Sequence, residues 1–368
     1  MADNKERFTL CESCAERQGD ETQEFSPAKG EEDCFICRGL TSRFPEIERS
    51  VVRRARGYQF RTFSIGVIIP AGIQEREDQL RSDLKIRGRE TIKTQLGRGI
   101  SDAVRREMKR KVDRQHPDIT VLVDLQRDAL SVTAKSIFVY GRYTKPPGIS
   151  QRRELCERCK GRGCQECQSG YRKGISVEEI LEDRLGRLLH STKAKFTWLG
   201  SEDPESTVLP PGRPFIAEVK DPRKRELPTR LSARTGSGMM KVTGLKVLRG
   251  KPTAIPSFTF KTRAFIQPEN RIEEVPAGLA KAMKATPIQF RNNKGKTVHK
   301  KVYSLKIERR GAGLVAEIKL DGGLPVKRLI SGGSVSLSLA ELFKTPLSCQ
   351  RFDILRVWES GGFKFGKI

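Results

Sequence analysis

The chain has 368 residues, enough for two or three domains, and 32% of them are charged against 36% hydrophobic. No apolar run reaches the ~18 residues of a membrane helix, and the first residues are polar, so we expect a soluble chain without a membrane span or a secretory signal. The net charge of +26 combines −6 over residues 1–33 with about +32 over the remainder. Such an excess of basic side chains favours nucleic acid as a partner, although it can also serve solubility alone.

Eight of the nine cysteines occur as C-x-x-C pairs, and the ninth is Cys349. The pairs are Cys11/Cys14, Cys34/Cys37, Cys156/Cys159 and Cys164/Cys167. Without a secretory signal such pairs indicate metal ligands rather than disulfides, and redox dithiols are the alternative. Two pairs can close one tetrahedral Zn²⁺ site of the structural kind. Four pairs can be matched into two sites in three ways, and we expect the pairs that are neighbours in sequence to share a site.

Between the two groups of cysteines, the pattern predicts a small α/β domain. The predicted elements are a basic helix over 45–57 and strands over 58–69, 119–125 and 130–140. Residues 85–114 carry eleven basic and four acidic side chains, which can form an RNA-binding surface or a solvated helix face. Apolar residues recur there at every fourth position from Ile92 to Val112, and this spacing drifts about 40° per step around a helix. We therefore predict two helical pieces that are separated near Gly97 and Gly99.

The second half of the chain reads mainly as strands. Ser176 and Glu179 form a capping box, which predicts a helix that ends at about Leu189. Further strands are predicted over 195–199, 214–219, 243–248, 257–265, 302–307, 313–320 and 352–358. The first two of these strands enclose a loop rich in glycine and proline that contains Glu202 and Asp203. Such a loop can position a reactive side chain, or the two acidic residues can simply form a turn.

Residues 200–215 read G-S-E-D-P-E-S-T-V-L-P-P-G-R-P-F. This stretch resembles the active-site loop of the archaeal and eukaryotic pseudouridine synthases that isomerise U54 and U55 in the TΨC arm of tRNA. In that family the loop reads G-R-E-D-x-D-V-R-x-L-G-x-G-R-P-F and its Asp is the nucleophile, a role that the match places on Asp203. Ser201 stands where the family has Arg.

The resemblance continues on both sides of this loop. Gly141-Arg142-Tyr143 is similar to the family's G-R-Y, and residues 156–167 are similar to a C-x-x-C-x-G-x-G-C-x-x-C of its archaeal branch. The resemblance implies that Arg263, at the place of a family Tyr, lies near the substrate, with Phe260 and Phe265 as nearby aromatic side chains. It also implies substrate contacts at Val326, Lys327 and Leu355, with Lys327 beside Asp203.

The implied fold class is α+β: a mixed or antiparallel pseudouridine synthase sheet with a smaller α/β THUMP-type domain and zinc-binding modules. The expected domains are a zinc module over 1–50, the THUMP-type RNA-binding domain over 51–145, a second zinc knuckle over 146–175 and the catalytic domain over 176–368.

The implied function is that of a cytoplasmic tRNA pseudouridine synthase, an isomerase with structural zinc and no organic cofactor. Its expected partner is tRNA, with no membrane and no evident obligate protein partner. The sequence leaves open whether U54, U55 or both are used, and what the oligomeric state is. One alternative is a non-catalytic, zinc-dependent RNA-binding scaffold. Another is a different THUMP-containing RNA-modifying enzyme, although no glycine-rich nucleotide loop is visible.

Overall fold

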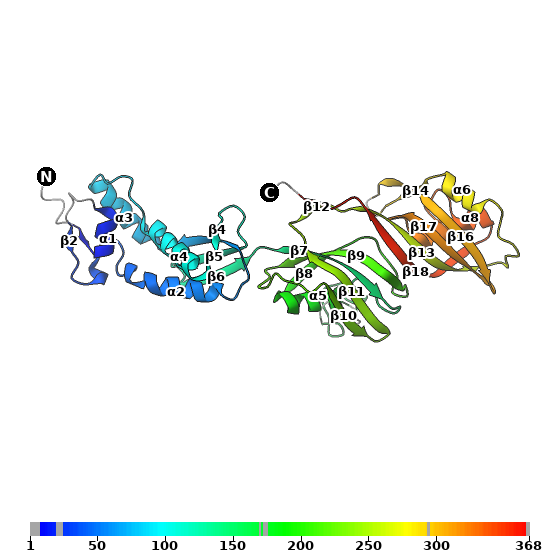
Figure 1. Cartoon of the computed structure of the whole chain (residues 1–368), viewed down its shortest axis with the longest axis horizontal. Helices are drawn as coiled ribbons and strands as arrows, with labels where there is room; N and C mark the ends of the chain where they lie inside the picture. The colour runs from blue at the N-terminus through cyan, green and yellow to red at the C-terminus, as the bar shows by residue number, and fades with distance from the viewer. Residues whose placement is uncertain (1–7, 20–24, 169–170, 172–175, 293–294, 366–368) are drawn as a thin grey trace. The chain divides into compact units, whose positions relative to one another are not determined.

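A computed structural model describes residues 8–19, 25–168, 171, 176–292 and 295–365. The chain forms two compact units (Figure 1). Unit 1 comprises residues 1–136 together with 221–225, and unit 2 comprises residues 137–220 together with 226–368. No helix among the described residues is long and apolar enough to cross a membrane.

Unit 1 joins a short cysteine-bearing segment to a four-stranded α/β domain. Its helices and strands are β1 Thr9–Leu10, α1 Glu12–Gln18, β2 Ser26–Pro27, α2 Phe44–Ala55, β3 Thr62–Ile68, α3 Ala71–Asp83, α4 Ile92–Met108, β4 Lys111–Val112, β5 Ile119–Asp124 and β6 Ala129–Ala134. The larger sheet has the order β4-β3-β5-β6, in which β3 pairs parallel with β4 and β5, and β6 pairs antiparallel with β5. Helices α2 and α4 pack against each other, and α4 also packs on β3.

Helix α4 is continuous, so the prediction of two helical pieces was wrong. Its buried side chains are Ile92, Leu96, Ile100, Ala103 and Val104. Only three steps of four residues separate Ile92 from Val104, a drift of about 120°, which one broad buried face can accommodate. The apolar series then leaves the helix, because Val112 lies on β4. Gly97 is no obstacle, since a glycine inside a helix costs only about 1 kcal/mol relative to alanine.

Unit 2 is built on a nine-stranded sheet. Its helices and strands are β7 Ile137–Lys145, α5 Val177–Leu189, β8 Lys193–Trp198, β9 Val208–Lys220, β10 Arg230–Thr235, β11 Gly238–Val247, β12 Pro252–Ala254, β13 Ser257–Pro268, α6 Leu279–Ala285, β14 Ile288–Arg291, β15 Thr297–Lys300, β16 Val302–Arg310, β17 Gly313–Asp321, α7 Val326–Ser331, α8 Leu339–Phe343, β18 Leu347–Ser360 and β19 Lys364–Phe365. The sheet order is β10-β11-β7-β9-β18-β13-β17-β16, with β8 paired to β9. All pairs are antiparallel except β9 with β18, so the sheet is mixed as predicted.

The expected domain boundary at residue 145 does not agree with this topology. Strand β7 lies between β9 and β11 in the large sheet, where it pairs with both. Ile137, Val139 and Tyr143 on this strand are buried in the core of unit 2. The sequence pattern of a short strand does not reveal its partners, because hydrogen-bonded neighbours can come from far along the chain.

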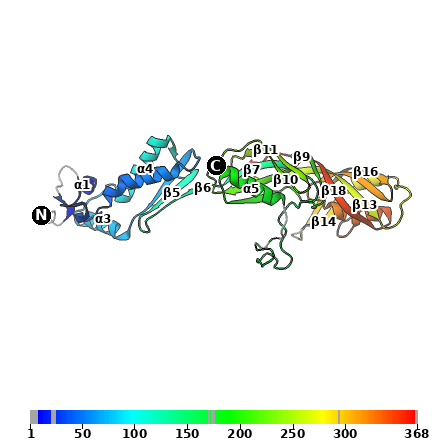
Figure 2. The same cartoon turned by 90° about the horizontal axis from the view of Figure 1, so that it is seen from below.

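The segment with the second group of cysteines leaves the sheet between β7 and α5. In Figure 2 it is the green loop that stands away from the strands. Its buried cysteines form a small cluster of their own and do not join the main core of the unit. The segment returns at Ser176, whose side chain accepts from Glu179 N and forms the predicted capping box of α5.

Candidate active site

Asp203 lies in the loop between β8 and β9, as expected from the sequence. The loop is closed by its own hydrogen bonds, in which Ser206 N donates to Asp203 O at 3.0 Å and Asp203 N donates to Ser206 Oγ at 3.3 Å. Its far end is attached to β18, because Thr207 N donates to Asp353 Oδ1 at 2.9 Å and Ile354 N donates to Thr207 O at 2.8 Å. The backbone that carries Asp203 is therefore fixed from two sides.

The carboxylate of Asp203 is paired with Lys327, at the start of α7. The distance from Lys327 Nζ to Asp203 Oδ2 is 3.0 Å. The Asp203 side chain is 28% exposed and that of Lys327 is 50% exposed, so the pair is open to solvent on the lysine side. The structure thus brings together the two residues that the sequence placed side by side.

Glu202, the neighbour of Asp203, points the other way into a fully buried polar cluster. Tyr143 donates from Oη to Glu202 Oε1 at 2.9 Å, and Arg213 Nη1 lies 3.3 Å from Glu202 Oε2. Arg213 also donates from Nε to the carbonyl of Leu199 at 3.0 Å. Burial raises the pKa of Glu202, against the opposing effect of Arg213. One acidic residue of the loop therefore anchors the loop, while the other pairs with Lys327.

Gln151 ties the same cluster to the segment that follows β7. It donates from Nε2 to Tyr143 Oη at 2.9 Å and to the carbonyl of Gly200 at 3.3 Å. The backbone N–H groups of Gly148 and Ile149 donate to the carbonyl of Pro204 at 3.0 and 3.2 Å. The start and the middle of the Asp203 loop are thus held by residues of another part of the chain.

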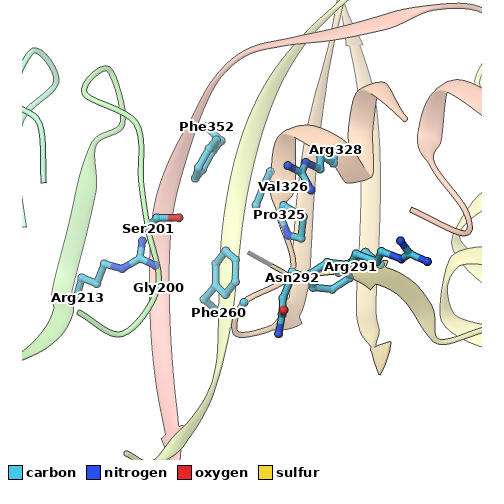
Figure 3. Close-up of a pocket in the computed structure, with 13 residues that line it drawn as sticks. Gly200, Ser201, Arg213, Phe260, Arg291, Asn292, Pro325, Val326, Arg328 and Phe352 are labelled. Atoms are coloured by element: carbon cyan, nitrogen blue, oxygen red, sulfur yellow. The ribbon is translucent and has the colours of Figure 1, made fainter. Parts of the chain in front are cut away.

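A pocket of about 450 Å³ opens next to this loop (Figure 3). Its lining residues are Gly200, Ser201, Arg213, Phe260, Phe290, Arg291, Asn292, Gly323, Leu324, Pro325, Val326, Arg328 and Phe352. Flat apolar rings from β13 and β18 face the loop before α7, and three arginines line the same space. Such a pocket can hold a flat polar ring and an attached phosphate. Gly200 and Ser201 of the Asp203 loop, and Val326 beside Lys327, connect it to the Asp203–Lys327 pair.

The eight paired cysteines form two groups with the expected membership. Cys11, Cys14, Cys34 and Cys37 form one group, and within each group all four sulfurs lie within 4.8 Å of one another. The Sγ–Sγ distance is 3.6 Å for Cys11 and Cys37, and the corresponding distances are 3.5 to 3.9 Å in the second group. Four thiolates about 2.3 Å from one zinc ion would be about 3.8 Å apart, so both groups fit a tetrahedral ion.

Comparison with known proteins decides the family. The family description "Pus10 THUMP domain, archaeal" matches residues 47–124, and "Pus10, C-terminal" matches residues 138–252. A tRNA pseudouridine synthase Pus10 of Nitrosopumilus maritimus is 30% identical over 329 residues, which cover 89% of this chain and 86% of that protein.

The chain belongs to the Pus10 family. The Pus10 of Methanopyrus kandleri is 31% identical over 360 residues, with 90% and 82% of the two chains covered. Among solved structures, a chain of an H/ACA RNP bound to a substrate RNA containing 2′-deoxyuridine matches with a TM-score of 0.31 and 13% identity. That match covers 59% of this chain and 47% of the other.

Of the site residues that the Pus10 resemblance singled out, only Val326 lines the pocket. Asp203 and Lys327 adjoin the pocket through their chain neighbours, whereas Arg263 and Leu355 lie elsewhere on the sheet. Arg263 faces the opposite side of the sheet from Phe260 and Ala264, because side chains alternate along β13. Its guanidinium lies 2.7 Å from Glu317 on β17, so it pairs with that carboxylate and not with Asp203. Leu355 lies half-buried at a β-bulge of β18, and Phe352 is the residue of that strand that lines the pocket.

The sequence did not single out Phe352, Arg213 or Arg328, all of which line the pocket of this Pus10 protein. Arg213 belongs to the Gly-Arg-Pro-Phe block that follows the loop, so its proximity could have been suspected. Phe352 comes from a strand that is about 150 positions away in the chain. The pairing of β18 with β9 on one side and with β13 on the other brings it to the site.

Proposed function

We propose that this chain isomerises uridine to pseudouridine in the TΨC arm of tRNA, at position 54, 55 or both, with Asp203 as the nucleophile. Membership of the Pus10 family supports the reaction and the tRNA substrate. The observation that supports the assignment to Asp203 is its carboxylate, which is paired with Lys327 beside a pocket of about 450 Å³.

The reaction rearranges the nucleoside without any co-substrate. The bond from N1 to C1′ breaks, the uracil turns, a bond from C5 to C1′ forms, and the proton lost from C5 is balanced by the proton gained at N1. The enzyme needs an ionised carboxylate that reaches C1′ or C6 of an extruded base. Lys327 places an opposite charge 3.0 Å from Asp203 Oδ2 in this partly buried site.

The pocket supplies the remaining requirements. Phe260, Phe352 and Val326 offer apolar surface for the faces of a uracil that has left its stack. Arg291 and Arg328 at the same pocket can bind the phosphates next to the extruded nucleotide. Arg263 and Leu355, for which substrate contacts were expected, do not line this pocket.

We propose that unit 1 binds the phosphate groups of the tRNA. A groove of about 630 Å³ between β3 and α4 is lined by Lys93, Arg98, Arg105 and Arg114. Basic side chains in a groove of this kind bind RNA by shape and charge rather than by sequence. We place the enzyme in the cytoplasm with its tRNA substrate.

Both cysteine groups are proposed to hold zinc. Four thiolates fill the coordination sphere of the ion, so the metal supplies folding energy and takes no part in the isomerisation. Elemental analysis of protein purified without added metal should give close to two zinc ions per chain. A value near zero with fully reactive thiols would refute both sites.

The function is tested by incubating the purified full chain with an unmodified tRNA transcript and mapping pseudouridine at every position. We expect modification in the TΨC arm, most strongly at U55. A transcript in which U54 and U55 are both replaced by cytidine is the matched control and should stay unmodified. Tight binding without pseudouridine at any position would support the scaffold alternative instead.

A further inference from the structure

Lys145, the last residue of β7, is buried below the Asp203 loop although it carries an ammonium group. Only 2% of the residue is exposed. The register of the sheet places it opposite Val208, the first residue of β9, so its side chain starts where the loop ends. Burial of an ammonium carries a large desolvation cost, and an apolar side chain of similar length would pack in the same place without that cost.

The ammonium of Lys145 donates to three backbone carbonyls of this one loop. The distances from Nζ are 3.3 Å to Asp203 O, 2.9 Å to Pro204 O and 2.7 Å to Ser206 O. An ammonium has three N–H donors, so the loop accepts all of them. Among the described residues, no carboxylate lies within ion-pair distance of this nitrogen.

The charge of Lys145 therefore acts on its surroundings at longer range. Its acidic neighbours are Glu202, Glu205, Asp203 and Asp353, and each of them favours the charged lysine. Burial lowers the pKa of Lys145 against these four groups. The buried Glu202 and the partly buried Asp203 and Asp353 lie close to this loop, and one buried cation offsets part of their mutual repulsion.

We propose that Lys145 is a positioning residue for Asp203, which fixes the loop backbone so that the carboxylate keeps its place against Lys327, next to the pocket. This inference rests on the proposed role of Asp203. Lys327 pairs with the carboxylate itself, whereas Lys145 touches only the backbone behind it. A displacement of about 1 Å in a reacting group can lower a rate by about 100-fold, so this backbone anchor is expected to affect the chemical step.

The test compares Lys145→Met with Lys145→Arg and with Lys241→Met as a matched control. Met preserves the length and removes the charge and the donors, Arg retains both, and Lys241 is an exposed residue on the neighbouring strand β11. Single-turnover pseudouridine formation, tRNA affinity, thermal unfolding and hydrogen exchange of residues 199–207 are measured for each protein.

Lys145→Met should lower the single-turnover rate by about 100-fold and leave tRNA affinity within about twofold, because positioning acts on the transition state and not on ground-state binding. Amide exchange at Asp203 and Ser206 should become at least about tenfold faster, which reports the loosened loop. Lys145→Arg should recover most of both losses, and Lys241→Met should match the wild type.

A Lys145→Met protein with the wild-type rate, or with a slower rate but wild-type exchange in the loop, would overturn the proposal. If Lys145→Met does not fold, Lys145→Arg and Lys145→Gln carry the test: the glutamine variant must be slower than the arginine variant and its loop must exchange faster. The exchange measurement needs no activity. If the wild type makes no pseudouridine, the proposed function fails, and exchange alone decides whether Lys145 holds the loop.

Discussion

Each unit of the molecule contains a cluster of buried charged side chains, and these two clusters have different consequences. In unit 1, Glu77 on α3 accepts from Arg17 at 3.1 Å and from Gln18 at 2.8 Å, both on α1, and from Ile92 N at the start of α4. In unit 2, Glu202 accepts from Tyr143 and pairs with Arg213. The first cluster fastens the cysteine-bearing segment to the α/β domain, and the second fastens a loop whose next residue is Asp203.

The comparison shows that a buried ion pair does not by itself identify a reactive site. Both glutamates are almost completely buried and fully paired. What distinguishes unit 2 is the adjacent carboxylate, which is partly exposed and lies beside a pocket. The cysteine groups differ in a similar way: the first packs into the core of unit 1, whereas the second forms a cluster of its own.

The largest expected effect comes from the first cysteine group. Cys14→Ser should unfold the cysteine-bearing segment and destabilise unit 1 by several kcal/mol, because structural zinc sites contribute about 10–16 kcal/mol of apparent binding free energy. Thermal unfolding, zinc content and limited proteolysis measure this. Cys159→Ser is the matched variant, and it should lose one zinc ion while the main unfolding transition moves by about 1 kcal/mol or less. Equal destabilisation by both variants would contradict the difference between the two groups.

Glu77→Gln should destabilise unit 1 by about 3–5 kcal/mol, since it leaves Arg17 buried without its anionic partner. Denaturant unfolding of the zinc-loaded protein measures this change. The control is Glu90→Gln, which breaks the solvent-screened pair with Arg98 and should cost far less stability. Similar costs for the two variants would show that the buried cluster does not hold unit 1 together.

Reversing two charges on α4 tests the RNA-binding role of unit 1. Arg105→Glu combined with Arg106→Glu should weaken tRNA binding about tenfold or more and reduce the slope of log affinity against log salt by roughly one per lost phosphate contact. Both side chains are exposed, so the fold should persist. Arg187→Glu on α5 of unit 2 is the control and should have little effect. If the α4 variant and the α5 control lost tRNA affinity equally, α4 would have no specific role in binding.

Glu202→Gln also leaves Arg213 buried without its anionic partner and should cost stability as Glu77→Gln does; the smaller effect that it tests is the pH dependence of that stability. Because burial raises the pKa of Glu202 above its ordinary value of 4.5, the folded protein binds this proton more tightly than the unfolded chain does. The contribution of Glu202 to the free energy of unfolding is therefore complete below about pH 4.5. It decreases as the pH rises through the raised pKa, by at most about 1.4 kcal/mol per pH unit. The variant should lack this part of the pH dependence, as unfolding measured at several pH values would show. If the free energy of unfolding had the same pH dependence in the variant and in the wild type, the raised pKa would not belong to Glu202.

The sequence predicted the features that depend on local pattern. The capping box of α5, the position of Asp203 between two strands and the grouping of the cysteines all follow from residues that are close together in the chain. The pairing of Lys327 with Asp203 was anticipated only because the resemblance to a known family supplied the long-range relation.

The remaining features depend on contacts that no local pattern encodes. The placement of β7 in the large sheet requires its pairing with β9 and β11. The orientation of Arg263 away from the pocket depends on which face of β13 is covered, and Phe352 reaches the site through the β9–β18 pairing. In the sequence, Lys145 looks like any basic residue at the end of a strand. Its role follows only from the loop carbonyls that accept its hydrogen bonds in the structure.

The most direct test of the account is pseudouridine formation by Asp203→Asn, measured at each position of a tRNA transcript alongside tRNA affinity. The amide is neutral and a poor nucleophile, so the variant should form no pseudouridine while it binds tRNA almost as tightly as the wild type. Glu202→Gln, measured in parallel, should retain more activity than Asp203→Asn, because Glu202 acts only by anchoring the loop and its carboxylate does not face the pocket. Full activity in Asp203→Asn would contradict the assignment of the nucleophile.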